Sequence, residues 1–435
     1  MSQRSTRPRP ASIRPGLGLL VVVVAVAVNL RPAITAVPPV LDAIQTDLGL
    51  SATGAGLLTA LPVLCMGVFA PVGAALARRV GREAAVSCAL ILVVGGTLVR
   101  GVDDSAVVLY GGTLLAGIGI AIGGALLPGV VKAWFPARPG AVTGLYTAGL
   151  VAGAMLASVA TVPLMDALGV GWPPAIAAWA LLAVAALAAW VPVTRRLRVA
   201  ADPAPGRARL PWGSAVAWRV TLYMGLQSLL YYAALTWLAP VYVDTGWSAG
   251  RAGLLLGLFS FTQIFSALAV PALADRTGDH RPWLALCVGT ATVMLAAFGL
   301  APTAAPWLWA ALLGLGVGGM FALALTLLVK LAPTPAEAAS LSGMALLVGY
   351  LLAATGPVLA GALYDAAGSY RVPFLALAGI GVATLAIGVS VPPAATTSRE
   401  SWNPGVAEPV PISEAQPATP ERQGREVPRS WTSGW

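Results

Sequence analysis

The sequence predicts an all-α membrane protein with twelve transmembrane helices in two parallel six-helix repeats and both termini in the cytoplasm. Hydrophobic residues make up 58% of the chain and charged residues only 10%, whereas soluble globular chains carry about 25% charged residues. Apolar stretches of about 17 to 25 residues recur along nearly the whole chain, each long enough to cross roughly 30 Å of hydrocarbon as a helix. Blocks of the first half also reappear in the second half.

The apolar stretches divide the chain into two sets of six spans. The first set is expected at 17–40, 54–76, 84–100, 106–131, 141–163 and 172–193, and the second at 218–242, 251–273, 283–301, 306–330, 339–363 and 372–391. The predicted organisation is a cytoplasmic N-terminus (1–16), an N-terminal bundle (17–193), a cytoplasmic linker (194–217), a C-terminal bundle (218–391) and a tail (392–435). The tail mixes Pro, Ser, Glu and Arg without apolar periodicity, so we expect it to be disordered in the cytosol.

Lysine and arginine gather in alternate connectors between the spans. Short basic loops stay on the cytoplasmic side of a membrane, which places both ends of the chain in the cytoplasm. The basic connectors hold Arg78, Arg79, Arg82, Lys132, Arg138, Arg195, Arg196, Arg198, Arg207, Arg209, Arg276 and Arg281, and the others hold mainly Asp42, Asp47, Asp103, Asp104, Asp166, Asp244 and Asp365. Membrane topology therefore explains the net charge of +9, and no nucleic-acid partner is expected because no single helix face collects the arginines.

An internal repeat runs through the chain at a nearly constant offset. The block from Asp47 to Leu58 matches the block from Asp244 to Leu255, 197 residues later, and three further blocks match in the same order. Six helices per copy give both copies the same orientation, so the repeats are related by an axis along the membrane normal. This architecture predicts a solute path between the halves and alternating access by rocking of one half against the other.

The connector after the second span of each half carries a recognisable pattern. Leu76 to Arg82 reads L-A-R-R-V-G-R and Leu273 to Asp279 reads L-A-D-R-T-G-D. Both resemble the loop signature of the major facilitator superfamily, whose acidic position is Asp275 in the second copy but Arg78 in the first. The resemblance implies a role in gating for Arg79, Gly81, Asp275, Arg276 and Gly278.

A second resemblance is more specific. The run Asn29, Leu30, Arg31, Pro32 is similar to the cyanate permease and 2-nitroimidazole exporter family within that superfamily, and further similar blocks lie in essentially every span. Where the family pattern has polar residues in the fourth, tenth and eleventh spans, this chain has Gly124, Val317 and Leu346. The resemblance therefore implies a transporter with a less polar cavity, and the family's solutes carry over only as a class.

Arg31 is the outstanding residue of the spans. It lies about fourteen residues into the first span, roughly 21 Å along a helix that rises 1.5 Å per residue. An arginine near the middle of the bilayer costs about 2.5 to 3.5 kcal/mol on insertion scales, so it usually faces a cavity or a partner. No carboxylate is expected at that depth, which leaves a transported anion, backbone carbonyls, water or snorkelling to satisfy the guanidinium.

Other polar side chains in the spans are candidates to line the same cavity. The repeat offset makes Ser228 the counterpart of Arg31, with Gln227 beside it, and both are expected to face Arg31. Buried amides, hydroxyls and phenols need partners in lipid. The candidate substrate-binding residues are Arg31, Thr35, Asn29, Gln227, Ser228, Tyr231, Gln263, Tyr146 and Tyr350, with Tyr232 as a further lining candidate.

These features favour a secondary active or facilitative transporter of a small anionic or polar nitrogen-containing solute, cyanate-like or nitroimidazole-like, with uptake or efflux open. Membrane-embedded enzymes need clustered His or carboxylates near an interface, and none is found, so neither enzyme activity nor a cofactor or metal is expected. The alternatives are a broad-specificity drug exporter and, in another class, a membrane solute sensor. We expect a monomer in the cell membrane, surrounded by lipid. Uniport, anion exchange and coupling through the solute's own proton stay open.

Overall fold

The computed structural model describes residues 17–196, 210–332 and 334–392, which are almost entirely helical. The expectations for the N-terminus, the tail and most of the linker lie outside these residues. The first half contains α1 (Leu17–Asn29), α2 (Pro32–Thr35), η1 (Pro38–Val40), α3 (Leu41–Leu48), α4 (Ala52–Val68), α5 (Ala70–Val80), α6 (Arg82–Val99), α7 (Ala106–Trp134), α8 (Pro139–Leu168) and α9 (Trp172–Arg196). The second half contains α10 (Ala215–Asp244), α11 (Ala249–Thr277), α12 (Arg281–Leu300), α13 (Pro306–Lys330), α14 (Pro335–Ala367) and α15 (Arg371–Val389).

The predicted class, an all-α membrane protein, is confirmed. Within the described ranges, ten helices are long and apolar enough to cross a membrane, or eleven if the bent pair α4 and α5 forms one span. The seventh expected span corresponds to α10, which has 30 residues but carries Gln227, Ser228 and several aromatic residues that lower its hydropathy. The count of twelve spans and the orientation of the termini stay predictions.

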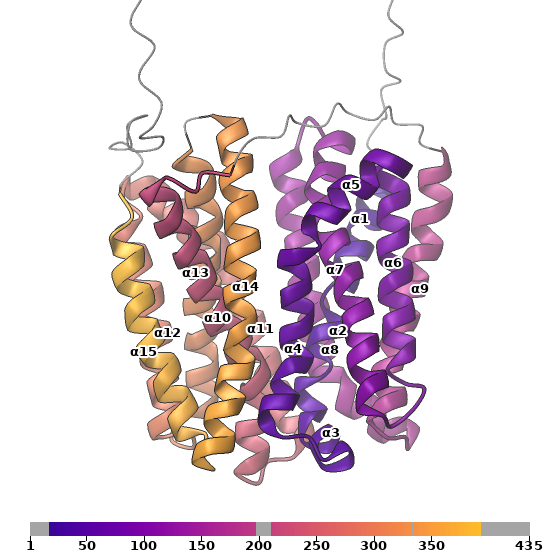
Figure 1. Cartoon of the computed structure of the whole chain (residues 1–435), viewed down its shortest axis with the longest axis vertical. Coiled ribbons are helices and arrows are strands. Elements are labelled where there is room, and N and C mark those ends of the chain that lie inside the picture. The colour runs from indigo at the N-terminus through magenta and orange to yellow at the C-terminus, as the bar shows by residue number, and fades with distance from the viewer. Residues whose placement is uncertain (1–16, 197–209, 333, 393–435) are drawn as a thin grey trace, which may run out of the picture.

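The two halves stand side by side as two bundles (Figure 1). The start of α1 and the ends of α5 and α9 lie at the top of Figure 1, and α3 lies at the bottom. We call the top the basic face, because Arg78, Arg79 and Arg276 lie there at helix ends. We call the bottom the acidic face, because Asp42, Asp244 and Asp365 lie there.

The first span is broken, which corrects the expectation of one helix over 17–40. α1 stops at Asn29, Leu30 and Arg31 form a turn, and short helices then lead to Leu48. Pro32 has no N–H to continue the helical ladder, and the Pro38–Pro39 pair interrupts the ladder a second time. At the repeat offset the second half has Leu229 in place of Pro32, and α10 is accordingly continuous.

The second span also differs from the straight helix expected over 54–76. α4 and α5 meet at Phe69 with a bend of 54°. Pro71, near the start of α5, lacks the N–H that would continue the ladder, which accounts for the bend.

The halves contact each other closely near the acidic face. The Asp365 carboxylate, at the end of α14, accepts hydrogen bonds from the backbone N–H groups of Ala52 (2.8 Å) and Thr53 (2.8 Å) and from the Thr53 hydroxyl (2.6 Å). A carboxylate from one half thereby caps the N-terminus of α4 in the other half, where the helix dipole favours negative charge. The carboxylate of its repeat counterpart Asp166, near the end of α8, makes no hydrogen bond within the described ranges.

We expect Asp365→Ala to loosen this contact. Loss of a helix cap should change the ratio of molecules with the acidic-face contact closed to molecules with it open by roughly threefold to tenfold. The measurement is the labelling rate of a cysteine placed at Ala52, which is 2% exposed, with a water-soluble thiol reagent. Asp166→Ala is the matched control and should leave the rate unchanged; equal rates in both variants would contradict the prediction.

Candidate functional site

A cavity of about 260 Å³ lies between the two halves. Its lining reaches Leu127, Tyr146 and Leu325, which are near the basic-face ends of α7, α8 and α13. The acidic-face end of the interface is held by the Asp365 contact. The structure is therefore closed toward the acidic face, and the cavity extends toward the basic face.

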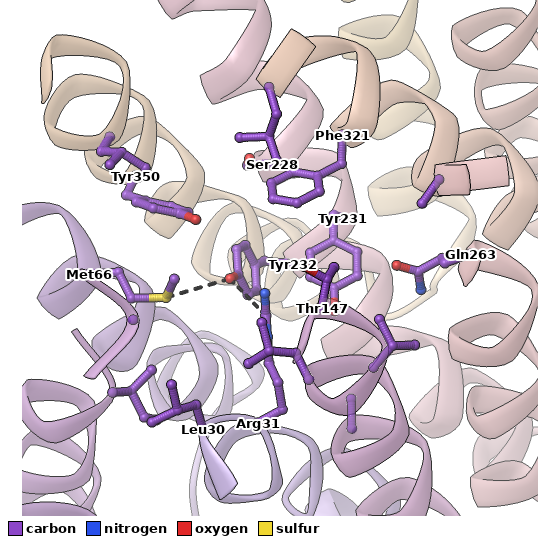
Figure 2. Close-up of a pocket in the computed structure, with 18 of the residues that line it drawn as sticks. Leu30, Arg31, Met66, Thr147, Ser228, Tyr231, Tyr232, Gln263, Phe321 and Tyr350 are labelled. Carbon is purple, nitrogen blue, oxygen red and sulfur yellow. Dashed lines mark hydrogen bonds between the residues drawn. The ribbon is translucent and has the colours of Figure 1, made fainter. Parts of the chain in front are cut away.

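Arg31 lies at the break of the first span and lines this cavity. Because the helix stops at Asn29, the Arg31 side chain leaves the span in the direction of the second half, where Figure 2 shows it pointing toward the hydroxyl of Tyr232. Its Nη1 donates a hydrogen bond to that hydroxyl at 3.1 Å. The guanidinium carbon lies 6.0 Å from the ring centroids of both Tyr231 and Tyr232, within the range of a cation–π interaction.

The two tyrosines hold each other in place. Their ring centroids are 4.8 Å apart in an edge arrangement, and the Tyr231 ring stacks on Phe259 at 6.1 Å. The Tyr232 hydroxyl also lies 3.7 Å from the sulfur of Met66 and donates to it. The only hydrogen bonds that the Arg31 side chain makes within the described ranges go to this phenol, so most of its five donors remain available in the cavity.

The second half supplies polar groups to the same cavity. Gln227, Ser228 and Gln263 all line it. The Gln227 Nε2 donates to the Ser228 hydroxyl at 2.6 Å and to the Met224 carbonyl at 3.1 Å. Its carbonyl oxygen is buried with no partner among the described residues. Gln263 donates to the Phe259 carbonyl at 3.2 Å, so its amide oxygen remains free to accept.

Tyr146 and Tyr350 are also lining residues, and neither hydroxyl makes a hydrogen bond within the part of the chain that the structure describes. Gly124, Val317 and Leu346, the positions expected to be less polar than in the family pattern, line the cavity as well. The cavity thus combines one cation, several phenols and amides, and a largely apolar wall.

Asn29 and Thr35 do not line the cavity. The Asn29 side chain is 3% exposed and donates to the Ala25 carbonyl in its own helix at 2.8 Å. Thr35 is fully buried, and its hydroxyl donates to the Arg31 carbonyl at 3.2 Å. Both side chains satisfy backbone carbonyls near the break.

Several lining residues were not selected from the sequence. Met66, Thr147, Ser260 and Phe321 all line the cavity. A sulfur, two hydroxyls and a ring are common in membrane helices, so their residue types alone carry no signal. Helical spacing supplies a signal for Ser260, because this residue lies three positions before Gln263 and therefore on the same face of α11.

The loop motif lies at the basic face, away from the cavity. Asp275 pairs with Lys330 at the end of α13, so this ion pair joins two helices of the same half. Arg79, Gly81, Arg276 and Gly278 end α5 and α11, and both glycines have positive φ (89° and 72°), which side-chain-bearing residues rarely adopt. In the first half, Arg78 occupies the position equivalent to Asp275, and Lys132 lies in the last turn of α7, as Lys330 does in α13.

Comparison with known proteins gives close relatives in sequence. The 2-nitroimidazole transporter of Escherichia coli (strain K12) is 36% identical over 363 residues, covering 83% of this chain and 91% of that protein. The cyanate transport protein CynX of the same organism is 33% identical over 371 residues, covering 84% and 96%. The uncharacterized transporter YycB of Bacillus subtilis (strain 168) is 36% identical over 362 residues, covering 82% and 89%.

Solved structures agree on the fold. The crystal structure of a D-xylose-proton symporter matches with a TM-score of 0.69 and 16% identity, covering 87% of this chain and 98% of that one. An inward-facing, occupied bacterial homolog of the human lysosomal transporter Spinster matches with a TM-score of 0.70 and 15% identity, covering 89% and 97%.

The family model described as Major Facilitator Superfamily matches residues 19–357, which span both halves and the cavity between them. The resemblance predicted from the loop motif and from the run around Arg31 is confirmed. The chain is a multi-pass membrane transporter of small solutes rather than an enzyme, and it belongs to the Major Facilitator Superfamily.

Proposed function

We propose that this transporter carries a small anionic or polar nitrogen-containing solute, of the cyanate-like or nitroimidazole-like class, and that Arg31 anchors it. The proposal includes operation as a monomer in the cell membrane with the basic face in the cytoplasm, so that the cavity opens inward. The relatives named for 2-nitroimidazole and cyanate transport support the solute class.

One observation carries the proposal: the Arg31 guanidinium points into the cavity, and no carboxylate lies among the described residues that line it. A desolvated cation without a resident counter-ion attracts an anion, and the planar guanidinium fork matches planar oxygen or nitrogen acceptors. The amide oxygen of Gln263 lies on the other half and can accept from an N–H group of the solute. A ligand that bridges the two halves would stabilise their closure around it.

The test is a flux panel in proteoliposomes with cyanate, nitrate, 2-nitroimidazole and a neutral, nitrogen-free control such as glycerol. The expected result is saturable flux of at least one of the first three and none of glycerol. Empty liposomes provide the background. Active export of apolar dyes with no flux of any panel member would instead support the broad-specificity exporter, which the apolar wall at Val317 and Leu346 favours. Binding of a panel member without flux would support a solute sensor.

Tyr232→Phe is expected to weaken apparent solute affinity by roughly threefold to tenfold, the value of one buried hydrogen bond. The phenylalanine ring keeps the packing on Tyr231 but removes the hydroxyl that orients the Arg31 guanidinium. The measurement is the concentration dependence of flux for whichever panel member is transported. Tyr242→Phe is the matched control, because that hydroxyl bonds the Pro302 carbonyl near the acidic face; an equal loss in both variants would contradict a specific role for Tyr232.

A further inference from the structure

The break in the first span leaves a backbone carbonyl without its helical partner. Ala33 lies in α2, which ends at Thr35, so the helix does not continue far enough for the Val37 N–H to bond the Ala33 carbonyl. An unsatisfied carbonyl inside a membrane protein is costly. Something else has to bind it.

Arg100 binds this carbonyl. It follows the last residue of α6 and is fully buried, and its Nη1 donates to the Ala33 carbonyl at 2.8 Å. Its Nε and Nη2 have no partner among the described residues. Buried donors left without partners destabilise a fold, so general stability is a poor explanation for an arginine at this position.

The chain makes room for this side chain. A Cβ added to Gly112 on α7 would lie 2.7 Å from the Arg100 Cγ, 2.7 Å from the Gly96 carbonyl oxygen and 3.1 Å from the Arg100 backbone nitrogen. A side chain at position 112 would therefore clash with the backbone of α6 as well as with Arg100. Glycine at this position allows α6 and α7 to pack closely and leaves room for the Arg100 side chain.

The second half lacks every part of this arrangement. At the repeat offset of 197, Arg100 corresponds to Ala297, Gly112 to Trp309 and Pro32 to Leu229. The matching helix α10 continues through Leu230, the counterpart of Ala33, so the carbonyl at that position keeps a helical partner. Arg100, Gly112 and the break at Pro32 all occur in the half that carries Arg31. The half that carries Ser228 has none of the three.

The bound carbonyl is tied directly to Arg31. The Arg31 carbonyl accepts hydrogen bonds from the N–H groups of Ile34 at 2.9 Å and Thr35 at 3.1 Å, so residues 31 to 35 form one compact turn that includes Ala33. The hydrogen bond from Arg100 to the Ala33 carbonyl therefore also restrains the backbone of Arg31.

We propose that Arg100 is a positioning residue that holds the broken segment 30–37 and thereby fixes the direction of Arg31 in the cavity. It does not touch the solute. The expected effect of Arg100 on solute affinity rests on the proposed function. The expected effect on the order of segment 30–37 does not.

The first experiment is hydrogen–deuterium exchange on the full chain in proteoliposomes, comparing the parent with Arg100→Met and Arg100→Lys. Methionine keeps much of the buried volume but cannot donate, so exchange at the amides of 30–37 should become faster by about tenfold or more. Lysine retains a donor and should restore most of the protection. Arg219→Met is the matched control, because it removes an arginine bond to a different carbonyl, that of Ser390, and should leave the segment unchanged.

Unchanged exchange at 30–37 in a folded Arg100→Met protein would overturn the proposal, whatever is found about the solute. If Arg100→Met does not fold, Arg100→Leu is the second variant, because it likewise removes every donor. A folded Arg100→Leu protein with parental exchange at 30–37 would overturn the proposal equally.

The second experiment measures flux of cyanate, or of nitrate if cyanate is not carried. Arg100→Met should raise the half-saturating concentration by about tenfold with a smaller change in maximal rate, and Arg100→Lys should recover much of the affinity. A merely structural role would lower the amount of active protein without changing half-saturation. If the parent carries no anion while exchange still responds to Arg100→Met, the proposed function fails and the positioning role stands.

Discussion

Replacing Arg31 with Gln is expected to weaken binding of a small anion by roughly 10- to 100-fold, the value of one or two charge-assisted hydrogen bonds. Glutamine can still donate to a solute, but it carries no charge. Because a cation inside the membrane is costly, the same substitution should leave the melting temperature unchanged or raise it. Arg31→Lys keeps the charge and loses the planar fork, so its affinity should fall between the two.

The measurements are equilibrium binding and flux of cyanate and nitrate, together with melting followed by size-exclusion chromatography. Arg251→Gln is the matched control, since Arg251 is exposed and stacks on Trp247 with 3.8 Å between the guanidinium carbon and the ring centroid, outside the cavity. Parental flux in a folded Arg31→Gln protein would show that Arg31 is not the anchor. A large fall in melting temperature would indicate a structural role instead.

Gly153→Leu is expected to cause a large loss of stability. Even the Cβ of an alanine at this position of α8 would lie 2.0 Å from the Val28 carbonyl oxygen and 2.9 Å from its carbon. That carbonyl belongs to the backbone of the broken span, where Pro32 cannot donate to it. Because the clashing atoms are backbone atoms, they cannot move aside as the end of a flexible side chain could. Overpacking of this kind costs about 1 to 3 kcal/mol, and leucine adds three further carbon atoms to the clash.

The expected result is a lower melting temperature and loss of flux, because α8 and α1 have to separate next to Arg31. Gly144→Ala is the control on the same helix. A Cβ at Gly144 meets nothing within 4 Å, so this change should be neutral or stabilise the helix by about 0.5 to 1 kcal/mol. Similar melting temperatures for Gly153→Leu and the parent would contradict the packing argument.

The sequence predicted the helices well and the break poorly, for a physical reason. Length and apolarity are sufficient to identify a membrane helix, so most spans lie where they were expected. A proline within a membrane helix is often tolerated when neighbouring groups satisfy the freed carbonyls, so Pro32 alone did not predict a break. Arg100, which binds a carbonyl left free at the break, lies more than sixty residues away in the chain, so the local sequence does not reveal this contact.

The candidate site was also predicted only in part from the sequence. Arg31, Gln227, Ser228 and Gln263 stood out because polar groups in apolar helices need partners, and all four line the cavity. Asn29 and Thr35 stood out for the same reason but bond carbonyls of their own segment, an alternative that spacing alone does not distinguish. Arg100 was not selected, because an arginine at the end of a span ordinarily snorkels to the surface; here the missing side chain of Gly112 allows it to turn inward.

The two basic-face loops differ in a way that affects how fast a solute arrives. In the second half, Asp275 neutralises Lys330, whereas the first half has Arg78 at the position of Asp275 and Lys132 in the last turn of α7, both exposed. The mouth of the cavity on that side therefore presents an excess of positive charge. Such a potential raises the local concentration of anions and accelerates their encounter with the protein. Because salt screens exposed charges beyond about 8 Å at physiological ionic strength, the association rate should fall as salt rises, while binding at the sheltered Arg31 changes much less.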